Sequence, residues 1–124
     1  MTQGQLLGVR LADAKSFRLG QVRWLMATEL GDLYAGVRLL PGLPLAAAVR
    51  GTGVNAADDK YVQAVALAAV PALKAPATLV LAPGWFRPKR VVEAAIQKPQ
   101  RVRLLEVLER GTDFERVAYE ALSD

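Results

Sequence analysis

The chain has 124 residues, of which 52% are hydrophobic and 23% are charged, and its net charge is +4. This length and balance fit one globular domain or two small subdomains, and they exclude an intrinsically disordered chain. Because the sequence contains neither cysteine nor histidine, it excludes disulfides and thiol chemistry and argues against zinc sites and a histidine base. No apolar run approaches the length of a membrane-spanning helix and no secretory signal is visible, so we expect a cytoplasmic protein without membrane insertion.

The hairpin predicted at residues 18–39 is the clearest element of the sequence. Residues 18–26 and 33–39 alternate apolar and polar side chains, which is typical of half-buried strands. Gly31 followed by an aspartate supplies a turn between them. A further strand is predicted at residues 5–12, so we expect additional strands to join this hairpin.

The predicted hairpin has an apolar face that contains Val22, Trp24 and Met26 on its first strand. We expect this face to be buried, with Trp24 as a core anchor, because aromatic side chains in mid-strand most often pack inside. Stacking of Trp24 on a ligand is the alternative interpretation.

Proline and glycine divide the rest of the chain into short segments, which indicates strands joined by turns. Residues 45–52 fit either a helical turn or a strand. Residues 105–110 are helix-forming and precede Gly111, where a helix C-cap would lie. Residues 53–60 are small and polar, which predicts a loop or a subdomain boundary. Further strands are predicted at residues 61–70, 77–81, 91–96, 101–104 and 114–122.

The predicted fold class is therefore mostly β. We expect a small antiparallel β-barrel, or two, of about eight or nine short strands with one or two short helical turns. The predicted organisation is a strand and hairpin region at residues 1–52 and a second β-rich module at residues 53–124 packed on it. One continuous domain is the alternative.

Two groups of cations are candidates for a surface that binds an anion, a nucleotide or a partner. The first group would form one basic patch if the first three strands pair in order. In the second group, at residues 85–103, two aromatic side chains that could stack a base lie beside cations that could hold phosphate. The alternative is that the aromatic residues are core anchors and the cations pair with acids on neighbouring strands. The candidates are Arg10, Arg18, Arg23 and Arg38 in the first group, and Trp85, Phe86, Arg87, Lys89, Arg90, Arg101 and Arg103 in the second.

Two segments of the predicted hairpin resemble the later strands of PilZ domains. They read Gly20-Gln-Val-Arg-Trp and Ala35-Gly-Val-Arg-Leu-Leu, and they are similar to a family strand of the type xVxW and a closing strand of the type GVxF/L. PilZ domains are small β-barrels that bind the bacterial second messenger cyclic di-GMP. The resemblance covers residues 6–40 and implies a bacterial β-barrel.

The ligand motifs of that family are R-x-x-x-R and D/N-x-S-x-x-G, and neither occurs in the sequence. Asp13 and Ser16 do not form the second motif because their spacing is wrong. We therefore carry over no ligand residue and expect no binding of cyclic di-GMP by this chain alone. Either the native protein extends upstream with these motifs, or the barrel kept its scaffold and lost the nucleotide.

The function predicted from the sequence is that of a non-enzymatic, PilZ-like β-barrel module with a regulatory, signalling or protein-interaction role. We expect a protein partner or self-association, and no cofactor or metal. The alternative is a small-barrel nucleic-acid-binding module that uses the basic segment at residues 85–103. An enzyme is a third possibility, and it would have to rely on carboxylates alone. No motif of a phosphate loop or a nucleophile elbow is present.

Overall fold

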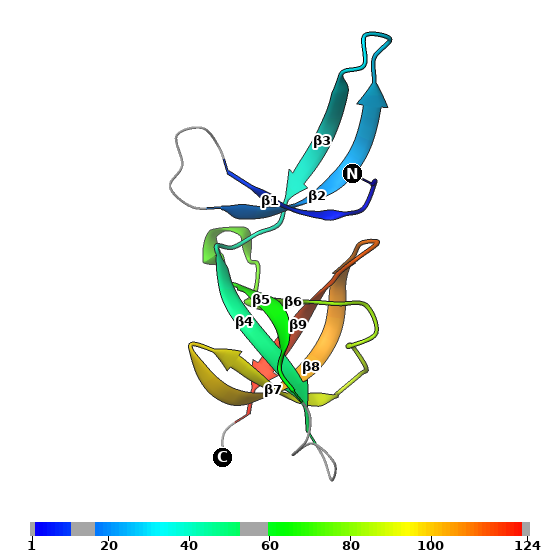
Figure 1. The fold of residues 1–124 in the computed structure, drawn as a ribbon. Coiled ribbons are helices and arrows are strands. Elements are labelled where there is room, and N and C mark those ends of the chain that lie inside the picture. The colour runs from blue at the N-terminus through cyan, green and yellow to red at the C-terminus, as the bar shows by residue number, and fades with distance from the viewer. Residues whose placement is uncertain (1, 11–16, 53–59, 123–124) are drawn as a thin grey trace.

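The computed structural model describes residues 2–10, 17–52 and 60–122, and its nine strands form two sheets (Figure 1). The first sheet is antiparallel, with strand order β1-β2-β3. The other six strands close into an antiparallel barrel of order β4-β5-β6-β9-β8-β7, which confirms the predicted fold class. The strands are β1 (Leu6–Val9), β2 (Arg18–Ala27), β3 (Leu33–Leu39), β4 (Pro44–Gly51), β5 (Val62–Leu67), β6 (Thr78–Leu81), β7 (Val91–Ile96), β8 (Lys98–Arg110) and β9 (Glu115–Ala121).

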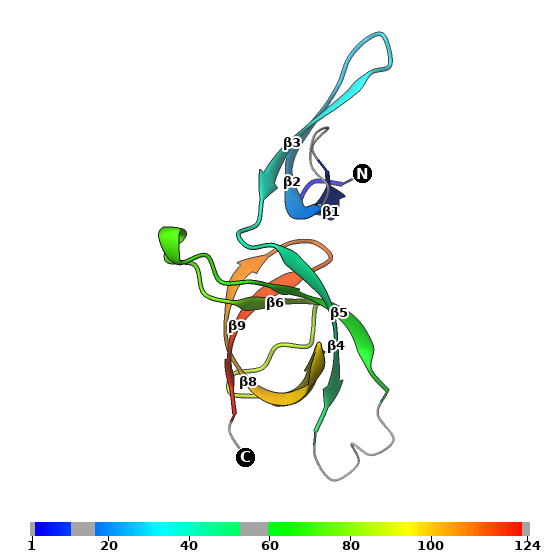
Figure 2. The same ribbon diagram turned by 90° about the vertical axis from the view of Figure 1, so that its left-hand side faces the viewer.

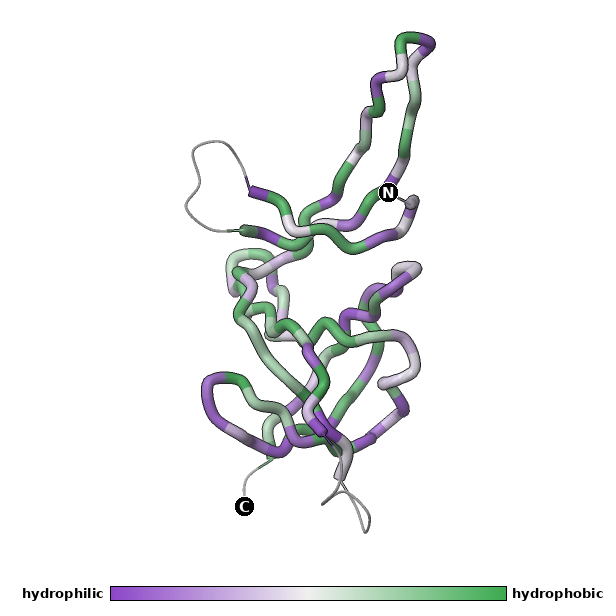
Figure 3. Tube along the Cα trace, in the orientation of Figure 1, coloured by the Kyte–Doolittle hydropathy of each residue, from purple (hydrophilic) through white to green (hydrophobic). Residues whose placement is uncertain are grey.

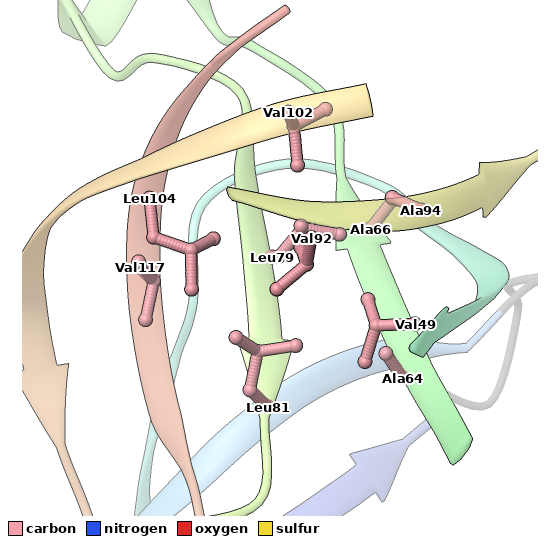
Figure 4. Packing of buried hydrophobic residues seen from close by; sticks show 10 residues of the cluster. All are labelled: Val49, Ala64, Ala66, Leu79, Leu81, Val92, Ala94, Val102, Leu104 and Val117. Atoms are coloured by element: carbon pink, nitrogen blue, oxygen red, sulfur yellow. The ribbon is translucent and has the colours of Figure 1, made fainter. Parts of the chain in front are cut away.

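The barrel encloses a cluster of buried hydrophobic side chains that come from all six of its strands (Figure 4). Successive side chains of a strand point to opposite faces, so Val92 and Ala94 of β7 and Val102 and Leu104 of β8 all point inwards. Alanines occupy three of the inward positions, where small side chains suit a narrow barrel. The cluster consists of Val49, Ala64, Ala66, Leu79, Leu81, Val92, Ala94, Val102, Leu104 and Val117.

A second, smaller cluster joins the first sheet to the outside of the barrel. Phe114 lies at its centre, is 1% exposed, and packs with Leu40, Leu67 and Val80. Leu6 of β1 packs against the same cluster. This contact explains why all four residues of β6 are buried: one face of the strand lines the barrel interior and the other faces the first sheet.

Hydrogen bonds fasten the same junction. The turn between β8 and β9 approaches the start of the chain, where Thr112 N donates to Gly4 O at 3.1 Å. The backbone N–H of Leu6 donates to Asp113 Oδ1 at 2.9 Å. The first sheet is therefore attached to the barrel near β1 and through the chain that links β3 to β4 (Figure 2).

The outer part of the β2–β3 hairpin projects away from the barrel (Figures 1 and 2). Val22 is 1% exposed, but Trp24 is 51% exposed, so the prediction that Trp24 is a core anchor was wrong. Met26 on the same predicted face is also exposed. The pairing register shifts by a β-bulge between Val22 and Trp24, and beyond it no described element packs on either face.

Two other predictions are corrected by strand pairing. Residues 105–110 are not helical, because β8 continues through them to Arg110 and pairs with β9 across two register shifts. Cross-strand pairing thus overrides local helix propensity here. The strand predicted to reach Val70 ends at Leu67, and the short 3-10 helix η2 (Pro71–Leu73) follows it.

The change from one sheet to the other occurs between β3 and β4. The ambiguous residues 45–52 lie almost entirely in β4, which pairs with β5 and β7 inside the barrel. The division predicted at residue 52 had placed this strand with the first region. The predicted loop at 53–60 lies, except for its last residue, outside the described residues.

Candidate interaction surface

The first group of candidate cations does not form one patch. Arg18 lies opposite Val9 in the register, whereas Arg38 lies opposite Gln21. Because Arg18 and Gln21 are an odd number of residues apart on β2, Arg18 and Arg38 lie on opposite faces of the sheet.

Three of these four cations have partners within the chain. The guanidinium of Arg10 lies 5.6 Å from the centre of the Phe17 ring, a cation–π contact. Arg18 donates to the backbone oxygen of Leu40 at 3.3 Å. Arg38 forms an ion pair with a glutamate of β8, and Arg23 is exposed at the bulge.

The second group is divided between the barrel wall and solvent. Trp85 and Phe86 are half-buried and pack against the barrel core, which agrees with their alternative interpretation as anchors. The guanidinium of Arg90 lies 4.9 Å from the centre of the Trp85 ring, and its Nη1 donates to the Trp85 backbone oxygen at 2.8 Å. Arg103 forms an ion pair with Glu120 at 2.9 Å. The exposed cations of this segment are Arg87, Lys89, Lys98 and Arg101.

Glu109 of β8 connects the first sheet to the barrel by charge. It forms an ion pair with Arg38 of β3 and accepts a hydrogen bond from Arg116 Nε of β9 at 3.0 Å. The side chains of Glu109 and Arg116 are only 15% and 9% exposed. This network stabilises the junction, and Arg38 is already paired with Glu109 within the chain.

A second polar cluster lies on the barrel wall. The hydroxyl of Tyr61 donates to Glu93 Oε1 at 2.5 Å, and Arg50 donates to Glu93 Oε2 through Nε and Nη2 at 3.2 and 2.9 Å. The hydrogen bond from Tyr61 and then the bonds from Arg50 lower the pKa of Glu93 below its ordinary value of 4.5. The same hydrogen bond raises the pKa of Tyr61, because it is lost when the phenol ionises beside a carboxylate.

We expect Tyr61→Phe to raise the pKa of Glu93 towards its ordinary value, since the Tyr61 bond is the largest cause of the depression. A depressed carboxyl pKa contributes stability above the unfolded pKa, which is lost as the pH falls through the folded pKa. An NMR titration of the Glu93 side-chain carboxyl carbon measures the shift. Tyr34→Phe, a change at a distant exposed tyrosine, should leave the Glu93 pKa unchanged.

The β2–β3 hairpin carries large apolar side chains that are exposed, which the sequence did not predict. Figure 3 colours the hydrophobic residues along this hairpin green. Trp24 and Met26 of β2 lie opposite Gly36 and Tyr34 of β3, so these four residues share one face. A Cβ at Gly36 would overlap the Trp24 indole, which shows that the ring lies across β3. We call this set, together with the exposed residues of β3 and the turn, the hairpin surface: Trp24, Met26, Leu30, Leu33, Tyr34, Val37 and Leu39.

Described residues line two open pockets. One, of about 240 Å³, is lined by Gln3, Gly4, Gln21, Val22 and Arg23 and is the more polar of the two. The other, of about 280 Å³ at the junction, is lined mainly by apolar side chains, among them Leu6, Val65 and Phe114. Its acidic residue, Asp113, already accepts the backbone N–H of Leu6. Within residues 2–10, 17–52 and 60–122, no three acidic side chains gather as a metal-binding cluster.

The fold and its surfaces define the class of this protein as a small closed antiparallel β-barrel that carries an additional three-stranded sheet. The chain belongs to the FimW C-terminal beta-barrel domain family, whose model matches residues 47–122. The match covers most of the barrel and none of the first sheet. No curated protein and no solved structure matches the chain. In the described part of the chain, no helix has the length and hydropathy of a membrane span.

Proposed function

We propose that this chain is a non-enzymatic, bacterial, cytoplasmic β-barrel module, similar to a PilZ domain without its ligand motifs, that acts through protein interaction in a regulatory role. The closed barrel supports the β-barrel part of this proposal, and only the sequence resemblance at residues 20–24 and 35–40 supports the PilZ-like part. Those residues lie in β2 and β3 and at the end of β3, next to the barrel and not in its wall. In this proposal the first sheet and the barrel are two modules of one unit.

The observation that carries the proposal is the contrast between charged and apolar surfaces. Many candidate cations are engaged inside the chain, including Arg38, Arg90 and Arg103. The hairpin surface, in contrast, leaves large apolar side chains at the solvent, with Leu30 of the turn 91% exposed. Its members lie on both faces of the hairpin, with Trp24, Met26 and Tyr34 on one of them. Exposed apolar patches mark interaction sites in soluble proteins.

The second candidate function is nucleic-acid binding, and the exposed cations Arg87, Lys89 and Arg101 favour it. It requires aromatic rings that are free to stack on bases. Trp85 and Phe86 pack against the barrel core, and Arg90 covers the Trp85 ring. We therefore place protein interaction first.

We expect the protein to bind neither a labelled single-stranded oligonucleotide nor cyclic di-GMP with micromolar affinity, which would require about 8 kcal/mol. Exposed arginines give weak attraction, because each exposed ion pair contributes only about 0–1 kcal/mol. Fluorescence anisotropy at low and moderate salt and calorimetric titration measure the two affinities.

Two results would contradict this expectation. One is oligonucleotide binding that weakens steeply with salt and is lost in the triple variant Arg87→Gln, Lys89→Gln, Arg101→Gln, which would establish the second function. The other is a saturable cyclic di-GMP isotherm that Arg18→Ala or Arg23→Ala abolishes. The control for both titrations is Lys74→Gln, because Lys74 is exposed and lies outside both groups of candidate cations.

A further inference from the structure

Within the described part of the chain, no strand pairs with the outer edge of β3 along its full length. The barrel is closed, so its strands have neighbours on both sides, whereas β3 pairs with β2 alone among the described strands. Proteins usually protect such edges with lysine, proline or a covering segment, because a free edge accepts a further strand. β3 reads Leu-Tyr-Ala-Gly-Val-Arg-Leu, and its single charge, Arg38, is held by Glu109.

The hydrogen bonds of the hairpin determine which residues of β3 face outwards. Leu40 N donates to Leu19 O at 2.8 Å, and Asp32 O accepts from Thr28 N at 2.8 Å. Even-numbered residues therefore bond to β2, and alternation leaves the backbone groups of the odd-numbered residues pointing out of the sheet. The outward-facing residues are Leu33, Ala35, Val37 and Leu39.

We propose that the occupant of this edge is β3 of a second copy of the chain, paired antiparallel about a two-fold axis at Gly36. This inference rests on the interaction role proposed for the hairpin surface. The register aligns Leu33 with Leu39 of the second copy, and Ala35 with Val37, so outward groups meet outward groups along all seven residues. It joins the two three-stranded sheets into one and places the two barrels at its opposite ends.

The single charge of β3 is compatible with this register. Arg38 falls opposite Tyr34 of the second copy, in a non-hydrogen-bonded pair where side chains lie closest. No two like charges face each other, and an arginine beside an aromatic ring is a favourable contact. On the other face all the paired residues are apolar, namely Leu33 with Leu39 and Ala35 with Val37.

The Trp24 ring lies at the centre of the proposed interface. It lies across Gly36, which is the residue on the proposed axis. The absence of a side chain at Gly36 lets the two backbones approach, and the two Trp24 rings then flank the axis on one face. Aromatic residues at the centre of an interface contribute most of its affinity.

The exposed area of the hairpin corresponds to a small interface. Because an aromatic side chain can bury roughly 150–250 Å², Trp24 and Tyr34 at about half exposure offer on the order of 200 Å² per copy. The strand edge and the side chains of Leu33, Val37 and Leu39 add further buried area. In a standard interface each partner contributes roughly 800 Å². We therefore expect an association in the micromolar range, typical of small interfaces.

Sedimentation velocity of the full chain from about 1 μM to about 1 mM tests the association. We expect a concentration-dependent monomer–dimer equilibrium, with a blue shift of tryptophan emission on dimerisation that Trp24→Phe removes. A chain that stays monomeric over this range overturns the inference. So does a dimer whose formation leaves the Trp24 emission unchanged.

Variants of β3 test the register. Tyr34→Arg places two arginines opposite each other and should weaken the dimer at least about tenfold more than the neutral change Tyr34→Gln does. Leu30→Arg adds the same charge on the same hairpin outside the paired region, and its dimerisation should match the wild type. Equal dimerisation by Tyr34→Arg and Tyr34→Gln contradicts the register.

Ala35→Pro removes an outward N–H that β2 does not use, so it should abolish the dimer while circular dichroism shows an intact fold. Dimerisation that survives this change overturns pairing through β3. If the chain stays monomeric and binds no nucleic acid, the dimer is excluded but the proposed interaction role is not. If the chain dimerises and binds nucleic acid through the basic segment, the proposed interaction role is contradicted but the dimer is not.

Discussion

Phe114→Ala is expected to lower the free energy of unfolding by about 3–5 kcal/mol, as large-to-small changes do in a packed interior. Phe114 is 1% exposed and forms the centre of the cluster that joins the first sheet to the barrel. Its ring also packs on Gly111, where a Cβ would overlap it. Removal of the ring therefore opens a cavity against several partners, among them Leu40 and Val80, that cannot all close in.

Urea unfolding followed by circular dichroism measures the loss. Phe17→Ala is the matched control, because Phe17 is 56% exposed and the same substitution there should cost less than about 1 kcal/mol. Hydrogen exchange should also accelerate at the Leu6 amide, whose acceptor Asp113 adjoins the altered residue. A loss for Phe114→Ala as small as that for Phe17→Ala would mean that this cluster does not hold the sheet to the barrel.

Glu109→Ala is expected to cost about 3 kcal/mol, at the lower end of the range for breaking a buried ion pair because Glu109 keeps some exposure. The change leaves the guanidinium of Arg116 buried without its carboxylate. Nη1 of Arg116 is already buried without a hydrogen-bond partner among the described residues, so little remains to compensate the charge. Arg38 loses its link from β3 to the barrel at the same time.

Glu120→Ala is the matched control, since Glu120 and Arg103 form an ion pair with side chains 48% and 41% exposed. An exposed pair contributes at most about 1 kcal/mol, and salt screens it. Unfolding of both variants at low and high salt should separate the two cases. The double change Glu109→Leu with Arg116→Leu should recover part of the stability, because it removes both buried charges. A double variant less stable than Glu109→Ala would contradict this account.

The candidate site was less predictable than the fold, and the cations illustrate the reason. The sequence places Arg18 and Arg38 on neighbouring strands, but the register places them on opposite faces of the sheet. Trp85 lies beside several cations in the sequence, and the structure shows that Arg90 covers its ring within the same turn. Spacing along the chain therefore identified the residues that contribute charge, and the pairing between strands decided which of them were available.

The sequence by itself determined that the chain folds into strands, because the alternation at residues 18–26 and 33–39 and the Pro and Gly breaks act over a few residues. The tertiary structure alone decided how the strands are divided between two sheets, since β4 pairs with β5 and with the distant strand β7 and not with β3, which precedes it in the chain. It also kept residues 105–110 in a strand, through pairing with β9. Trp24 is the clearest case: its alternation continues the face of the buried Val22, but the β-bulge between them places Trp24, opposite Gly36, on the other face of the sheet. Burial there would require a second layer, and no described element supplies one.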